Sequence, residues 1–130
     1  MKNHLREHAG FAAIFFSLAL FLLAFSVARS EDLAAGKKIF EGKCAQCHGK
    51  DAKGVVKMAK VLKVEPVLID LTRDEAVKLS NADKVKTVTE GNKKMPKYKG
   101  KLTDEQIGQV VQYLESLQGA GKKTNKTKAR

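Results

Sequence analysis

The sequence predicts an all-α domain of short helices and long loops, preceded by an apolar leader and followed by a basic tail. In the second half of the chain, apolar residues recur at helical spacing, and capping and stop signals bound those segments. No stretch alternates in the way expected of a reliable strand. With 130 residues, 6% aromatics and no Trp, one domain with a thin side-chain core is expected.

Residues 1–30 have the layout of a secretory leader. A basic start is followed by an uncharged apolar run at 9–28 and then by small residues, so cleavage is expected after Ser30 or Ala28. The run is long enough for a membrane-spanning helix, so an uncleaved anchor is the alternative. Both readings place residues 31–130 outside the cytoplasm, and we expect a periplasmic protein.

Loss of the leader changes which side chains are available. It removes His4 and His8, so that His48 is the only one of the three histidines left in the mature chain. It also removes three basic residues and one acidic residue, which lowers the formal net charge of +11 by two, to +9. A positive field favours acidic partners or surfaces, and a lysine-rich surface that only maintains solubility is the alternative.

The first half of the mature chain predicts one helix followed by irregular structure. Asp32 is placed to cap a short helix that runs up to the stretch CAQCHGKDAKG, in which Gly49 and Gly54 are breakers. Residues 55–70 combine β-branched residues with interleaved lysines and Pro66, which favours an irregular loop over a strand.

Two short helices and a loop are expected next. The first helix lies at residues 72–79, where Thr72 and Glu75 fit a capping box. The second begins at Asn81 or Asp83 and ends at the glycine that opens the next loop.

That loop covers residues 91–100, because Pro96 disfavours helical backbone at Met95. The final helix has the strongest signal in the chain, with Thr103 and Gln106 as its capping box. An apolar stripe of period near 3.6 follows, made of Ile107, Val110, Val111, Leu114 and Leu117. We expect this helix to end at Gly119 and residues 120–130 to form a disordered basic tail.

The two cysteines of the chain both lie in CAQCH, at Cys44 and Cys47. A structural zinc site needs four ligands, which the mature chain does not offer. A redox pair expects a βαβ setting, and a disulfide across so short a turn would be strained. C-x-x-C-H is the haem attachment pattern, because two thiols on one helical turn can each bond the haem while the next imidazole binds the iron. We therefore expect one covalently attached haem c, with His48 as an axial iron ligand.

The stretches AGKKIFEGKCAQCHG and VKTVTEGNKKMPKYKGKLTDEQIGQVVQYLESL together resemble the class I cytochromes c, which are small single-haem electron carriers. The resemblance covers nearly all of residues 31–120. It implies the cytochrome c fold, with the N-terminal helix at Gly36 and Phe40 packed against the C-terminal helix at Val110, Tyr113 and Leu114.

The residues by themselves do not determine the second axial ligand of the iron. The candidates are Met58, Met95 and a lysine, and the position could also be empty. The resemblance implies Met95. It also implies a proline carbonyl that accepts a hydrogen bond from the ligand histidine; Pro66 is a candidate, but its register is not established.

With both axial positions filled, no iron position is open to a substrate. We therefore predict a periplasmic electron carrier rather than an enzyme. The alternatives are a membrane-tethered redox subunit that keeps its leader, and a haem enzyme or gas sensor with an open distal site.

The expected partners are redox proteins with acidic docking faces. We expect a monomer, no nucleic-acid partner, and a membrane only if the leader is retained. The docking charges would be the lysines that flank the haem motif and Met95, namely Lys43, Lys50, Lys53, Lys57, Lys93, Lys94, Lys97 and Lys99.

Overall fold

The computed structural model describes residues 30–128 of the chain. The predicted leader therefore lies outside the described residues, except for Ser30. The chain divides into two compact units between Glu31 and Asp32, and the second unit contains all the elements that build the site. No helix in the described part is both long enough and apolar enough to span a membrane.

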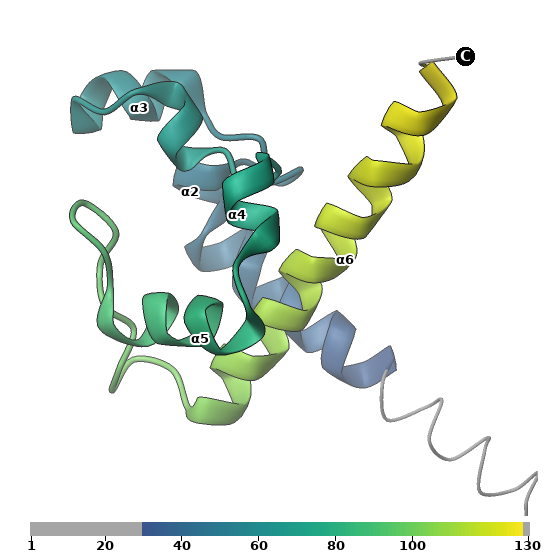
Figure 1. The fold of residues 1–130 in the computed structure, drawn as a ribbon. Coiled ribbons are helices and arrows are strands. Elements are labelled where there is room, and N and C mark those ends of the chain that lie inside the picture. Colours follow the sequence, from purple (N-terminus) through teal and green to yellow (C-terminus); the bar gives the residue numbers. More distant parts are fainter. Residues whose placement is uncertain (1–29, 129–130) are drawn as a thin grey trace, which may run out of the picture. The chain divides into compact units, whose positions relative to one another are not determined.

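The described residues fold into helices joined by loops (Figure 1). They contain no named strand, only isolated bridges between Asn92 and Met95 and between Lys99 and Leu102. The predicted all-α class is confirmed. In chain order the elements are a helix at residues 30–43, α2 at Ala45–His48, α3 at Val56–Leu62, the 3-10 helix η1 at Pro66–Ile69, α4 at Asp74–Lys78, α5 at Asn81–Glu90 and α6 at Asp104–Lys128.

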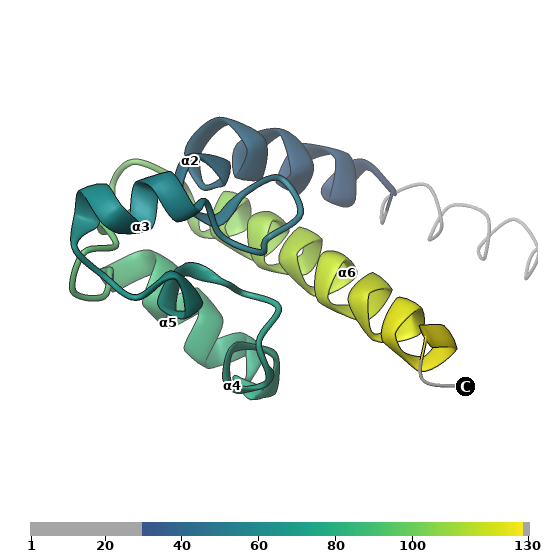
Figure 2. The same ribbon diagram turned by 90° about the horizontal axis from the view of Figure 1, so that it is seen from above.

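The N-terminal helix crosses α6 at close range (Figures 1 and 2). Gly36 permits this approach, because a Cβ added there would collide with the backbone carbonyl oxygen of Gln109. One turn further along, the buried ring of Phe40 meets Tyr113 edge-on at a centroid distance of 5.6 Å and also packs in the cluster of Val110. The helix contact implied by the family resemblance is thus confirmed.

The capping box predicted at Thr72 is wrong. Both the backbone N–H and the hydroxyl of Thr72 donate to Asp70 Oδ1, each at 2.7 Å. This turn competes with a helix cap for the same groups. As a result α4 begins only at Asp74, after Arg73, and has no side-chain cap.

The starts of α5 and α6 agree better with the sequence. Helix α5 begins at Asn81 as predicted, although its cap is Ser80, whose hydroxyl accepts from the N–H of Asp83 at 3.1 Å. The capping box of α6 is confirmed, since Thr103 Oγ1 accepts from Gln106 N at 3.2 Å and Gln106 Oε1 accepts from Thr103 N at 3.0 Å.

Two segments are more helical than predicted. Residues 56–62 form α3 where an irregular loop was expected, and this helix is closed by Lys63 in the left-handed conformation. Its β-branched residues lower helix propensity only slightly. Helix α6 continues beyond Gly119 to Lys128, so the predicted helix end is wrong. A glycine inside a helix costs only about 1 kcal/mol, and the residues that follow include good helix formers.

Candidate functional site

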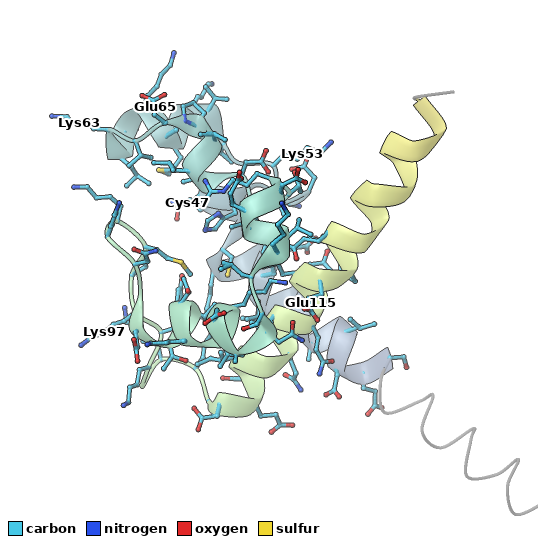
Figure 3. The ribbon with its side chains drawn as sticks, in the orientation of Figure 1. Cys47, Lys53, Lys63, Glu65, Lys97 and Glu115 are labelled. Carbon is cyan, nitrogen blue, oxygen red and sulfur yellow. The ribbon has the colours of Figure 1, made fainter. Side chains whose placement is uncertain are left out.

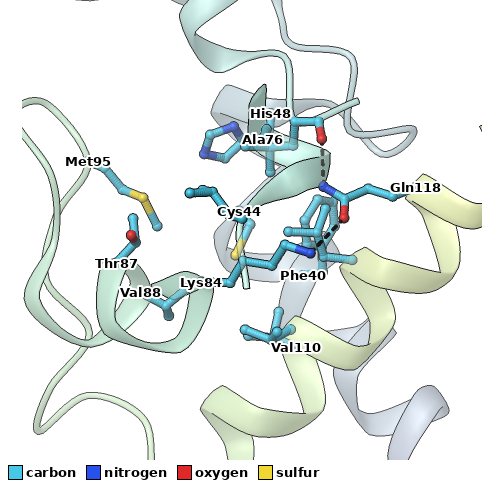
Figure 4. A pocket seen from close by; sticks show the side chains of 14 residues that line it. Phe40, Cys44, His48, Ala76, Lys84, Thr87, Val88, Met95, Val110 and Gln118 are labelled. Carbon is cyan, nitrogen blue, oxygen red and sulfur yellow. Dashed lines mark hydrogen bonds between the residues drawn. The ribbon is translucent and has the colours of Figure 1, made fainter. Parts of the chain in front are cut away.

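A cavity of about 580 Å³, measured out to its open mouth, lies among α2, α5, α6 and the loop that follows α5 (Figure 4). Most of its wall is apolar. Three of the four predicted site residues line it together with residues of the small core. Among the lining residues are Phe40, Cys44, His48, Leu71, Val88, Met95, Val110 and Leu114.

Cys44 and Cys47 stand on one helical turn, as the spacing predicts. The carbonyl oxygen of Cys44 accepts from the N–H of Cys47 at 3.1 Å and from the N–H of His48 at 3.0 Å. Both cysteines are free and half-buried, but only Cys44 lines the cavity. Burial, reinforced by the neighbouring Cys47 and opposed by Lys43, raises the pKa of the Cys44 thiol to about 11. The free thiol is therefore protonated at neutral pH.

The imidazole of His48 is buried and fixed in one orientation. Its Nδ1 lies 2.8 Å from the carbonyl oxygen of Ile69, so Nδ1 carries the proton and donates it. Burial lowers the pKa of His48, against a smaller raising effect of the bond to Ile69. The ring is therefore neutral at pH 7, and its Nε2 lone pair is free to bind a metal.

The carbonyl that holds His48 was not found from the sequence. Pro66 opens the 3-10 helix η1, but the acceptor is Ile69 at the other end of that element. Gly54 has φ +83°, and a Cβ there would lie 3.1 Å from Ile69 Cγ1, so this glycine lets the Ile69 segment approach. Every residue carries a carbonyl, so no residue type in the sequence indicates which one will be the acceptor.

Met95 reaches the cavity from the predicted loop (Figure 4). A tight turn carries it, in which Met95 N donates to Asn92 O at 2.8 Å and Asn92 N donates to Met95 O at 3.1 Å. Gly91 has φ +78°, and a Cβ there would stand 2.7 Å from Met95 O. Only glycine fits at that position. The other candidate, Met58, lies on α3 and does not line the cavity.

Tyr98 ties this loop to the helix that precedes the cysteines, a contact that the sequence did not suggest. Its hydroxyl donates to the carbonyl oxygen of Lys43 at 2.9 Å. Burial is the main cause that raises the pKa of Tyr98, and the nearby Cys44 and Cys47 add to the effect. The bond joins the segment after Met95 to the residue just before Cys44.

These residues fit the haem that the sequence predicts. The structure brings a protonated thiol, a neutral imidazole with a free Nε2 and a thioether to one apolar space. This donor set is that of a c-type haem with His/Met ligation. The described residues contain no group of three or more His, Cys, Asp or Glu side chains placed to bind a metal ion.

The predicted docking lysines are all exposed. Figure 3 shows Lys53 and Lys97 extending away from the body of the domain, Lys53 from the segment after α2 and Lys97 from the loop of Met95.

Comparison with known proteins places the chain among haem proteins. Residues 31–114 match the family model described as cytochrome c oxidase, cbb3-type, subunit III. The chain is 31% identical over 88 residues to cytochrome c6 of Diacronema lutheri, a match that covers 68% of this chain and 99% of the relative. It is 35% identical over 99 residues to cytochrome c6 of Thermostichus vulcanus, covering 75% and 81%. For cytochrome c6 of Synechocystis sp. (strain ATCC 27184 / PCC 6803 / Kazusa) the identity is 36% over 109 residues, covering 78% and 85%.

Replacement of Tyr98 by Phe should lower the free energy of unfolding by about 0.5–1 kcal/mol at pH 7, because one hydrogen bond is lost. Since the folded pKa is raised above 10.0, this stabilisation is complete below pH 10 and is lost as the pH rises through the folded value. Denaturant unfolding of the haem-loaded protein at several pH values measures the difference. Tyr113→Phe, which keeps the ring contact with Phe40, is the control, and a difference independent of pH would contradict the role of Tyr98.

Proposed function

This chain belongs to the small class I c-type cytochromes, and on that premise we propose a ligand set for its one covalently bound haem c. Cys44 and Cys47 form the thioether bonds to the haem, and His48 and Met95 are the two axial ligands of the iron. The observation that carries this proposal is that Cys44, His48 and Met95, from two separate segments, line one apolar cavity.

The protein transfers electrons and is not an enzyme. The bound haem supplies a one-electron couple between Fe(III) and Fe(II). The side chains of this protein hold the ligands still and keep water out. His48 is fixed by Ile69, and the loop of Met95 is fixed by its own turn and by Tyr98. A rigid and largely dry site limits the reorganisation that accompanies each change of charge.

Ligation by the thioether of Met95 would also affect the reduction potential of the haem. Methionine in place of a second nitrogen ligand raises the potential of a haem. A filled sixth position leaves no site for a substrate or a gas, so a peroxidase or sensor function is not favoured. The described residues offer Met95 for that position, because its side chain already faces the cavity.

We further propose that residues 1–30 are an export leader, removed from a periplasmic carrier whose haem domain covers residues 31–119. The basis is the sequence of the leader and its small residues before the cleavage point. A retained leader would instead tether the same domain to the membrane.

The protein has redox partner proteins, as its relatives imply. We propose that these partners present acidic faces to the exposed lysines around Met95, and that the carrier acts as a monomer. Four exposed lysines flank Met95 closely in sequence, and their combined positive field would steer a transient encounter. The lysines in question are Lys93, Lys94, Lys97 and Lys99.

The mass of the purified mature protein tests the leader and the haem attachment together. We expect the mass of residues 31–130 plus one haem, measured under denaturing conditions that keep thioether bonds. A mass equal to the full chain plus one haem would establish the tethered form. A chain without added haem mass would contradict attachment at Cys44 and Cys47.

Replacement of Met95 by Ala should open the sixth position of the iron. We expect the low-spin spectrum and its weak far-red band to be lost, the protein to bind CO, and the reduction potential to fall. Met58→Ala is the matched control and should leave the spectrum unchanged, because Met58 does not line the cavity. Retention of the far-red band in Met95→Ala would refute Met95 as ligand.

Charge reversal beside Met95 should slow oxidation by a small anion. For Lys93→Glu with Lys97→Glu, we expect the second-order rate with hexacyanoferrate(III) to fall about tenfold at low salt and the loss to disappear at high salt. The control is Lys37→Glu with Lys38→Glu, two exposed lysines of the N-terminal helix, because this double variant changes the net charge of the protein by the same amount. An equal loss of rate in both double variants would show that net charge, and no local docking site, governs the reaction.

A further inference from the structure

One charged side chain stands in the apolar wall of the cavity and has no part in the ligand set. Lys84, on α5, is only 7% exposed and lines the cavity together with Gln118 of α6 (Figure 4). A buried ammonium group is unfavourable unless it is paired and hydrogen-bonded. The fold therefore has to supply partners for it.

Those partners come from the middle of α6. Lys84 Nζ donates to Gln118 Oε1 at 3.1 Å and forms an ion pair with Glu115 Oε1 at 3.3 Å. Gln118 is itself 5% exposed, and its Nε2 donates to the carbonyl oxygen of Leu71 at 2.7 Å, which fixes its amide oxygen toward Lys84. Asn81 Nδ2 donates to the other carboxylate oxygen of Glu115 at 3.0 Å. The ammonium group is thus held in one place by groups that are themselves held.

The two partners of the ion pair differ in their position relative to the cavity. Lys84 and Gln118 line it, whereas Glu115 does not. Glu115 is 35% exposed and borders a separate, open depression, which also touches Lys84 and Gln118. Water screens the carboxylate more than the buried ammonium. The space where the haem is expected therefore has a net positive potential from this pair.

We propose that Lys84, positioned by Gln118 and partly offset by Glu115, raises the reduction potential of the haem. This role rests on the proposed function, because it requires a haem in this cavity. In the one-electron step a donor protein is oxidised and the iron is reduced; no bond forms or breaks, and the charge in the cavity falls by one. A positive charge in the wall favours the state of lower positive charge, which is the reduced one.

The test is the midpoint potential of three haem-loaded variants. Lys84→Met removes the ammonium and should lower the ratio of reduced to oxidised protein on the order of tenfold at a fixed ambient potential, which is about 59 mV for one electron. Glu115→Gln removes the offset and should raise the potential. Lys86→Met, an exposed lysine of the same helix that does not line the cavity, should have a much smaller effect than Lys84→Met.

Opposite signs for Lys84→Met and Glu115→Gln separate an electrostatic role from a structural one, because loosening the same ion pair would shift both potentials in one direction. Shifts of the same sign, or no shift in Lys84→Met, would overturn the proposal. If Lys84→Met yields no haem-loaded protein, the midpoint potential of Glu115→Gln is the test. A potential that is lower than or equal to that of the unsubstituted protein would then refute the role of Lys84. Visible spectra are recorded first. If the unsubstituted protein lacks the low-spin six-coordinate spectrum, the proposed ligand set is refuted. If the spectra are normal but the midpoint potentials do not shift as expected, only the role of Lys84 is refuted.

Discussion

The hydrogen bond from His48 Nδ1 to the carbonyl of Ile69 is the constraint on which the rest of the site depends. It decides which ring nitrogen carries the proton, and so which nitrogen is available to a metal. The bond joins two segments of the chain. The 3-10 helix η1 brings Ile69 to the histidine, and Gly54 leaves the space for that approach. Without this bond the ring would be free to rotate, and the Nε2 lone pair of His48 would have no fixed direction.

The second organising feature is that the domain is built around a space. The side-chain core includes Phe40, Ala52 and Val110, and further apolar side chains, among them Leu71 and Leu114, line the cavity. Burying apolar surface is the main favourable term in folding, so filling the cavity with an apolar group adds to the stability of the walls themselves. The crossing of the N-terminal helix over α6 at Gly36 keeps two of those walls together. Haem binding and folding are therefore coupled in this chain.

The polar network around Lys84 differs from both of these features. It contributes no ligand and little apolar contact, yet it connects α5, α6 and the segment at Leu71 beside the cavity. A buried ion pair is seldom the most stable choice for a helix contact, since desolvation offsets much of its attraction. Its position in the cavity wall gives it a consequence for the cofactor, because an electron-transfer protein is sensitive to any fixed charge near its redox centre.

The sequence by itself determined the all-α class, the final helix with its Thr103 cap and, through the CAQCH motif, the expectation of a covalently bound haem c. These features follow from local rules, because capping, helical periodicity and the spacing of thiols and imidazole act over a few neighbouring residues. The same local rules failed at Thr72, whose hydroxyl is taken by Asp70, and at Gly119, where the backbone continues as helix.

Only the tertiary structure decided which carbonyl accepts the hydrogen bond from His48. It also decided that Tyr98 bonds the Met95 loop to Lys43. Finally, it decided that Lys84 lines the cavity while Glu115 borders an open depression. The reason is physical. Carbonyls are present at every residue, and a lysine in an amphipathic segment has the same local pattern whether it faces water or a cavity. Its environment is set by residues far along the chain, and that information appears only when the helices are packed together.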